Sequence, residues 1–120
     1  MSDKADVKYR AFYLSLNIIK FIDTFDHRSS LKTISNQLIR AVTSIGANIV
    51  EAKSSSSKRE FINYFQISLK SANETKYWLA LLKELEPSNS QEIEKFITET
   101  IEISKILASS ILTMKGKKQL

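Results

Sequence analysis

The chain has 120 residues, the length of one domain, and 42% of them are hydrophobic. It contains no cysteine, which excludes a disulfide scaffold, a thiolate metal site and a cysteine nucleophile. Because the chain has only two glycines and one proline, we expect long helices and few turns. Its net charge of +5 predicts anionic partners.

The N-terminal sequence MSDKADVKYR is charged and lacks the apolar segment of a signal peptide. No apolar run reaches the roughly 18 residues that cross a bilayer. Together with the absence of cysteine, these features favour a reducing compartment. We therefore expect a cytoplasmic protein without a membrane partner.

The first half of the chain predicts two helices. The first, over about residues 4–26, is indicated by apolar side chains at spacings of three and four, from Val7 to Phe25. The polar segment DHRSS at 26–30 interrupts this pattern, and Ser29 or Ser30 is a candidate N-cap. The second helix is expected over about residues 31–53, followed by four serines at 54–57.

The second half predicts two more helices. The segment from Ser57 to Glu60 is a capping box that opens a helix over about residues 58–86. Pro87 ends it, and the serines and asparagine of 88–90 are available to cap a fourth helix over about 91–115, before a basic tail at 115–120. Four helices with short loops predict an all-α fold, a single antiparallel up-down four-helix bundle over residues 1–120.

The second helix carries an ordered polar stripe beside its apolar one. Arg40, Ser44, Asn48 and Glu51 recur every three or four residues and fall on one side of the helix. We expect them to form a structural polar network with Ser71 and Glu74 of the third helix. Its strongest link would join Arg40 to Glu74 or Glu51. A stripe that simply faces water and a ligand site are the alternatives.

The apolar surface is wider than a lone bundle needs. A second apolar stripe on the third helix comprises Ile67, Trp78, Leu81 and Leu85. Further apolar residues outside the main stripes are Phe12, Leu16, Ile19, Ile39 and Val50. We expect the stripe on the third helix to form an oligomer interface, and small residues (Ala41, Gly46, Ala47) to allow a close backbone approach there. A wide core with a few exposed side chains is the alternative.

Sequence signals of catalysis are weak. The single histidine, His27, lies in a predicted polar turn, and the chain has no glycine-rich phosphate loop and no zinc-protease motif. Glu51 and Glu74 are the remaining candidates for acid–base work, but the histidines of a di-iron carboxylate site are missing. We predict no enzyme activity, no cofactor and no metal.

Basic residues cluster near three predicted helix ends. They are Lys53, Lys58, Arg59, Lys115, Lys117 and Lys118. Such charges suffice for contacts with the phosphates of RNA or DNA. The sequence contains no motif that recognises particular bases. A solvated tail is the simpler interpretation of the last lysines.

We predict a non-enzymatic oligomeric scaffold or accessory protein that binds RNA or DNA. The alternative is a protein–protein interaction module that uses its exposed apolar faces.

The stretch QLIRAVTSIGANIVEA, followed by SKREFINYFQISLKSANET, resembles a small bacterial four-helix-bundle family first found in intervening sequences of ribosomal RNA genes. The matching residues are Arg40, Ala41, Ser44, Ile45, Asn48, Ile49, Glu51, Phe61, Phe65, Ser71 and Glu74. The sequence departs from the family pattern at Gly46, where proline is frequent, and at Ala52, where glycine is frequent.

This resemblance implies a bundle that assembles into a ring, typically a homopentamer. One branch of the related proteins, the accessory variability proteins of diversity-generating retroelements, works with a reverse transcriptase and binds nucleic acid through basic surfaces. By resemblance, the partners to expect are further copies of the chain, RNA or DNA, and a reverse transcriptase.

Overall fold

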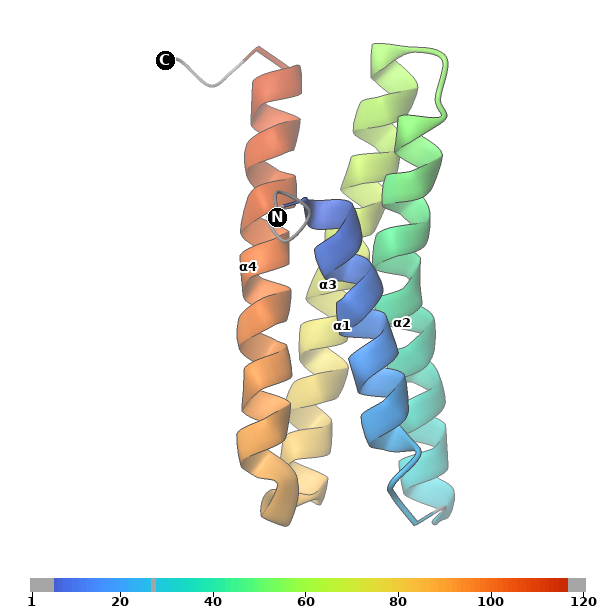
Figure 1. Ribbon diagram of the computed structural model, residues 1–120, viewed down its shortest axis with the longest axis vertical. Helices are drawn as coiled ribbons and strands as arrows, with labels where there is room; N and C mark the ends of the chain where they lie inside the picture. Colours follow the sequence, from blue (N-terminus) through green and yellow to red (C-terminus); the bar gives the residue numbers. More distant parts are fainter. Residues whose placement is uncertain (1–5, 27, 117–120) are drawn as a thin grey trace.

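The computed structural model describes residues 6–26 and 28–116. They form four α-helices and no strand: α1 (Val7–Ile22), α2 (Ser29–Lys53), α3 (Lys58–Leu85) and α4 (Ser90–Met114), with a short 3-10 helix η2 (Pro87–Asn89) between α3 and α4. The helices run up and down along a body of 46 × 26 × 24 Å. In Figure 1, α1 lies in front between α2 and α4, and α3 lies behind. The predicted all-α fold with four helices is confirmed.

The start of α3 is capped as the sequence predicts, with one difference. The Glu60 amide N–H donates to Ser57 Oγ at 3.1 Å. The Glu60 carboxylate, however, accepts from the amide N–H of Ser56 at 3.0 Å rather than from that of Ser57. The side chain therefore reaches one residue further into the serine loop and ties that loop to the first turn of α3.

Three predicted helix ends are wrong. α1 runs over Val7–Ile22 rather than 4–26, because the Asp6 carboxylate caps it by accepting from the Lys8 amide at 2.9 Å. At its other end, the Phe25 amide bonds to the Ile22 carbonyl in a turn outside the helix. Ser29 and Ser30 lie inside α2, whose N-cap is Arg28. α4 begins at Ser90 with Asn89 as N-cap, and neither cap residue makes a side-chain capping bond.

All four helices contribute to one hydrophobic core. Its fully buried large side chains include Ile18, Leu38, Ile45, Ile49, Leu79, Leu82, Ile93, Ile103 and Leu107. Two serine hydroxyls cross between helices in this core. Ser15 Oγ donates to the Val42 carbonyl at 3.1 Å, and Ser68 Oγ donates to the Ile45 carbonyl at 2.8 Å. These bonds align α1 and α3 along α2.

An ion pair holds α1 against α4. The Arg10 guanidinium donates two hydrogen bonds to the Glu99 carboxylate, at 2.6 and 2.8 Å. The hydrogen bonds with Glu99 raise the pKa of Arg10 above its already high usual value. The bidentate geometry of this pair orients both side chains.

Two of the three small residues of α2 contribute to packing within the bundle, whereas Ala47 is exposed. Ala41 is buried in the core. Gly46 faces α1 of the same chain, and a Cβ at this position would lie 3.5 Å from Ala11 Cβ. The expected close approach therefore exists, but it is between α1 and α2.

Replacing Gly46 by alanine should stabilise the protein. The added methyl group would make ordinary van der Waals contact with Ala11 at 3.5 Å, and alanine is preferred over glycine inside a helix by about 0.5–1 kcal/mol. We expect the free energy of unfolding, measured by urea denaturation, to rise by about that amount. A decrease would show that α1 lies closer to α2 than described.

Candidate functional site

One end of the bundle gathers most of the predicted nucleic-acid-binding residues. Lys58 and Arg59 lie in the first turn of α3, Lys53 ends α2, and Lys115 follows the last turn of α4. These four residues are called the basic end here. Lys117 and Lys118, like His27, lie outside the described residues.

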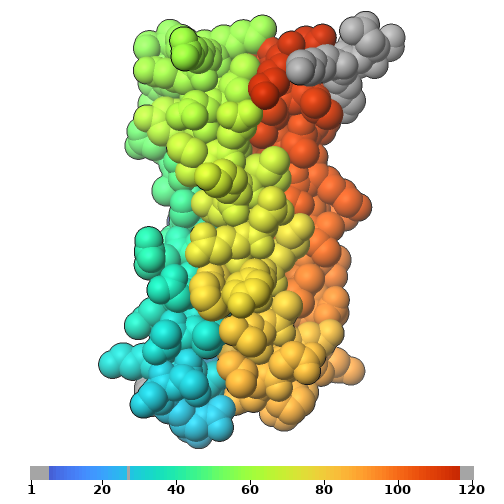
Figure 2. Space-filling view, turned by 180° about the vertical axis from the view of Figure 1, so that it is seen from behind, coloured from blue at the N-terminus to red at the C-terminus, as the bar shows by residue number. Residues whose placement is uncertain are grey.

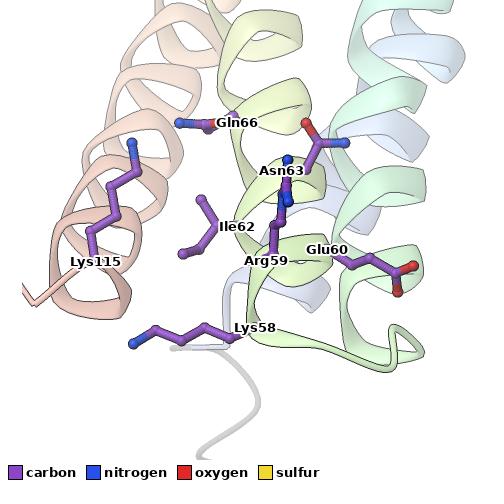
Figure 3. A pocket seen from close by; sticks show the side chains of 7 residues that line it. All are labelled: Lys58, Arg59, Glu60, Ile62, Asn63, Gln66 and Lys115. Carbon is purple, nitrogen blue, oxygen red and sulfur yellow. The ribbon is translucent and has the colours of Figure 1, made fainter.

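A groove of about 810 Å³ opens between α3 and α4 at the basic end. Its lining residues are Lys58, Arg59, Glu60, Ile62, Asn63, Gln66 and Lys115. Figure 3 shows Lys58, Ile62 and Gln66 extending from α3 toward α4, where Lys115 stands on the far wall. Glu60 points the other way, toward α2, so the one carboxylate of the lining does not face its cations.

The cations of the basic end have no carboxylate partner among residues 6–26 and 28–116. Lys53, Lys58, Arg59 and Lys115 are all exposed, and none of them belongs to an ion pair among the described residues. Exposed, unpaired ammonium and guanidinium groups bind phosphate oxygens. The groove also offers the amide groups of Asn63 and Gln66, which both donate and accept hydrogen bonds.

The opposite end of the bundle is acidic. Around η2 lie Glu84, Glu86, Glu92 and Glu94, and three of the four ion pairs of the described residues occur there. They are Arg28–Glu86 at 2.5 Å, Lys83–Glu94 at 2.7 Å and Lys95–Glu92 at 3.9 Å. The hydrogen bond to Glu94 raises the pKa of Lys83. Three cations of this end, Arg28, Lys83 and Lys95, are thus engaged by carboxylates, whereas none of the four cations of the basic end is engaged by a carboxylate of the described residues.

Half of the predicted polar network exists. Ser71 Oγ on α3 donates to Ser44 Oγ on α2 at 2.9 Å. Asn48 Nδ2 donates to the same hydroxyl at 3.0 Å and to the Ser44 carbonyl at 2.8 Å. Ser71 is buried, whereas Ser44 and Asn48 are half-buried. The three side chains form a small network at the seam between the two helices.

The charged half of that network is absent from the described residues. Arg40 and Glu51 are exposed, and no ion pair of the described residues includes Arg40. Glu74 instead accepts a hydrogen bond from Trp78 Nε1 at 3.1 Å. The predicted link from Arg40 to Glu74 or Glu51 is therefore wrong, because Glu74 is engaged along its own helix and the other two side chains turn outward.

The predicted interface residues on α3 differ in exposure. Ile67 and Leu85 are 37% and 40% exposed, whereas Trp78 and Leu81 are half-buried, and Trp78 also packs on the core. More exposed aromatic side chains are Tyr77 on α3, at 62%, and Phe12 on α1, at 58%. Sequence reasoning missed Tyr9 and Tyr13 on this helix and Ile62, Asn63 and Gln66 in the basic groove. The available signal was helical spacing, three residues from Tyr9 to Phe12 and three, four and seven residues from Arg59 to the groove residues; Tyr13, directly after Phe12, had no such signal.

The described residues contain no cluster of three or more histidine, cysteine or carboxylate side chains that could hold a metal ion. Within the same residues, no helix combines the length and the apolar character that crossing a membrane requires.

The fold and these sites define a small all-helical bundle protein with one basic and one acidic end. The chain belongs to the 23S rRNA-intervening sequence protein family, whose model matches residues 3–109. This confirms the resemblance based on the stretch from Arg40 to Glu74. Lys115, on one wall of the basic groove, lies beyond the matched residues.

A solved structure shares the fold closely. It is the crystal structure of a protein with unknown function from the S23 ribosomal protein family of Bacteroides thetaiotaomicron VPI-5482. Its sequence is 37% identical to the chain, and the alignment covers 88% of this chain and 98% of that one with a TM-score of 0.81. No protein of curated function matches the chain.

Proposed function

We propose that the protein is a non-enzymatic, oligomeric accessory or scaffold protein that binds RNA or DNA through phosphate contacts at its basic end. One observation carries this proposal. Lys58 and Arg59 on α3 and Lys115 on α4 line a single groove, and none of them is paired with a carboxylate of the described part of the chain. The match to a family named for an intervening sequence of 23S rRNA supports an RNA context.

The chemistry of the groove favours contact with the backbone over reading of bases. Cations on two helices are positioned for successive phosphates of a strand. Among the lining residues, no aromatic ring is available on which a base could stack. The side-chain amides of Asn63 and Gln66 can both donate and accept hydrogen bonds, so they do not select one base. We therefore expect affinity for both RNA and DNA with little sequence preference.

Self-association strengthens this proposal. Exposed apolar side chains on α1, α2 and α3 are those that contact between copies would cover. The resemblance leads us to expect a ring, typically of five copies. A ring multiplies the cations that a single strand meets, so moderate binding per chain becomes strong binding overall. A reverse transcriptase is a further partner to test on the same grounds.

The test is fluorescence anisotropy with a structured RNA and a duplex DNA, on protein whose mass is known from light scattering. Three phosphate contacts per chain predict a loss of affinity of about 40-fold when salt rises from about 50 to 200 mM. An oligomer that engages several copies should lose more. Absence of binding at the lower salt concentration would overturn the proposal.

A protein–protein interaction module is the second candidate. It is favoured by an apolar groove between α1 and α2, whose lining includes Phe12, Tyr13 and Val50. Binding of a protein partner through such a groove should depend little on salt, since burial of apolar surface releases no condensed counterions. The same anisotropy measurements therefore separate the two candidates.

A further inference from the structure

An apolar groove of about 550 Å³ runs between α1 and α2, whereas the basic groove lies between α3 and α4. Its lining residues are Lys8, Tyr9, Phe12, Tyr13, Ser15, Leu16, Ile19, Thr43, Gly46, Ala47 and Val50. This set is called the α1–α2 groove here. Phe12, Tyr13 and Val50 are 58%, 54% and 49% exposed. Large side chains grouped at such exposure mark an interaction surface.

Among the described residues, Lys8 is the only charged side chain in the lining of the α1–α2 groove. Its Nζ lies 5.0 Å from the centre of the Tyr9 ring, and it takes part in no ion pair among the described residues. A partner suited to this groove is therefore apolar, with a carboxylate near the end of the groove where Lys8 lies.

A second candidate face lies on the other side of α2. It is formed by α2 and α3, and its members are Arg40, Ser44, Asn48, Glu51, Ile67, Ser71, Glu74 and Trp78. This set is called the α2–α3 face. Figure 2 looks onto the side on which α2 and α3 lie next to each other, while α1 is on the far side. Ile67 is exposed, and Glu51 is exposed without an ion pair among the described residues.

We propose that the α2–α3 face of a second copy docks into the α1–α2 groove, and that this contact repeats from copy to copy. The inference rests on the proposed self-association and names its surfaces. The two faces flank α2 and so lie on adjacent sides of the bundle, roughly at right angles. When a head-to-tail contact uses adjacent sides, each copy is rotated relative to the one before, and the series closes into a ring. A contact between opposite sides would produce a filament instead.

Contacts within one chain give the heights of the residues along the bundle. Ala11 on α1 lies beside Gly46 on α2, and Ser44 on α2 bonds to Ser71 on α3. One helical turn from these pairs, toward the α2–α3 loop, Lys8 is level with Val50 and Ile67 is level with Asn48.

A ring whose axis is parallel to the helices keeps every copy at the same height. Residues at equal heights then meet across the contact. Ile67 of one copy is placed against the exposed ring of Tyr9 in the next, and Glu51 is placed against Lys8. The charge of Lys8 thereby meets a carboxylate that has no ion-pair partner among the described residues of its own chain.

Charge reversal tests this pairing. The variants Lys8→Glu and Glu51→Lys each place two like charges at the contact, and the variant with both substitutions restores opposite charges. We expect each single reversal to weaken assembly by about tenfold or more, and the double reversal to recover most of that loss. Sedimentation velocity over a range of protein concentrations gives the dissociation constants.

Lys105→Glu is the matched control, because Lys105 is an exposed residue of α4 outside both faces. A further variant, with Phe12 and Tyr13 both replaced by serine, removes apolar surface without touching the core, since both side chains are exposed. Circular dichroism verifies that each variant is folded. We expect the serine variant to dissociate and the control to assemble normally.

Three results would overturn the inference, and they differ in what they leave standing. A wild-type chain that is monomeric at all concentrations would also remove the proposed ring. An oligomer that is indifferent to both single reversals and to the serine variant would place the contact elsewhere, with the ring intact. Single reversals that dissociate the oligomer without recovery in the double variant would refute the pairing of Lys8 with Glu51.

Discussion

A chain in which Lys58, Arg59 and Lys115 are all replaced by glutamate should bind neither RNA nor duplex DNA measurably at about 50 mM salt, with an affinity at least about 100-fold below that of the wild type. The change removes the cations of the basic groove and adds three carboxylates in their place. Anisotropy titration measures the loss. Stability should change little, since acidic residues in the first turn of α3 interact favourably with the helix dipole.

The control for this variant has the same net charge. Lys20, Lys32 and Lys95 are exposed residues toward the acidic end, and their replacement by glutamate should weaken binding far less. Equal losses in the two variants would mean that overall charge, and not the basic groove, determines affinity. Unchanged binding in the first variant would exclude the basic groove as the site. Single replacements by glutamine should each lower the slope of log affinity against log salt by about 0.9.

Replacing Phe65 by alanine should destabilise the bundle by about 4 kcal/mol. Phe65 is 3% exposed, and its ring stacks on that of Phe61 with centroids 4.6 Å apart. It lies two turns along α3 from Lys58, so its loss should also loosen the helix turn that carries the basic groove. A loss of this size is a large fraction of the stability of a domain of this length. Urea denaturation followed by circular dichroism measures it.

Leu112 provides the comparison for the Phe65 variant. It is an apolar residue of α4 with 46% of its surface exposed, so Leu112→Ala should cost less than about 1 kcal/mol. If Phe65→Ala were equally mild, the first turns of α3 would not pack on the core as described.

The helices themselves were predictable, because apolar spacing and capping residues agree along most of the chain. The end of α1 was not. Phe25 continues the apolar pattern and packs on the core, with its ring 4.8 Å from that of Phe21, yet it does so from a turn beyond Ile22. Periodicity records which side chains are buried and says nothing of whether the backbone beneath them is still helical. The start of α1 had a signal, since Asp6 is a preferred N-cap residue.

The basic end was partly predictable for a topological reason. In an up-down bundle the start of the third helix and the end of the fourth lie at the same end, so Lys58 and Lys115 were expected to be neighbours. The polar stripe on α2 was harder. Spacing identifies the helix face on which Arg40 lies but not the residue that it contacts. The Glu74 carboxylate accepts its hydrogen bond from Trp78 Nε1 instead. Competition between donors for one acceptor depends on side-chain rotamers, which a sequence pattern does not contain.

Two serine hydroxyls that bond across helices oppose the sliding of one helix along another. A stripe of isoleucine and leucine tolerates sliding, because one helical turn, about 5.4 Å, brings similar side chains back into contact. The bonds from Ser15 to the Val42 carbonyl and from Ser68 to the Ile45 carbonyl do not tolerate it. After a slip of one turn, the buried Ser68 hydroxyl would lose the carbonyl that it now reaches, at a cost of about 1–3 kcal/mol. Hydrophobic packing alone would leave several alignments of α1, α2 and α3 nearly equal in energy. The hydrogen bonds of these two hydroxyls select one of them.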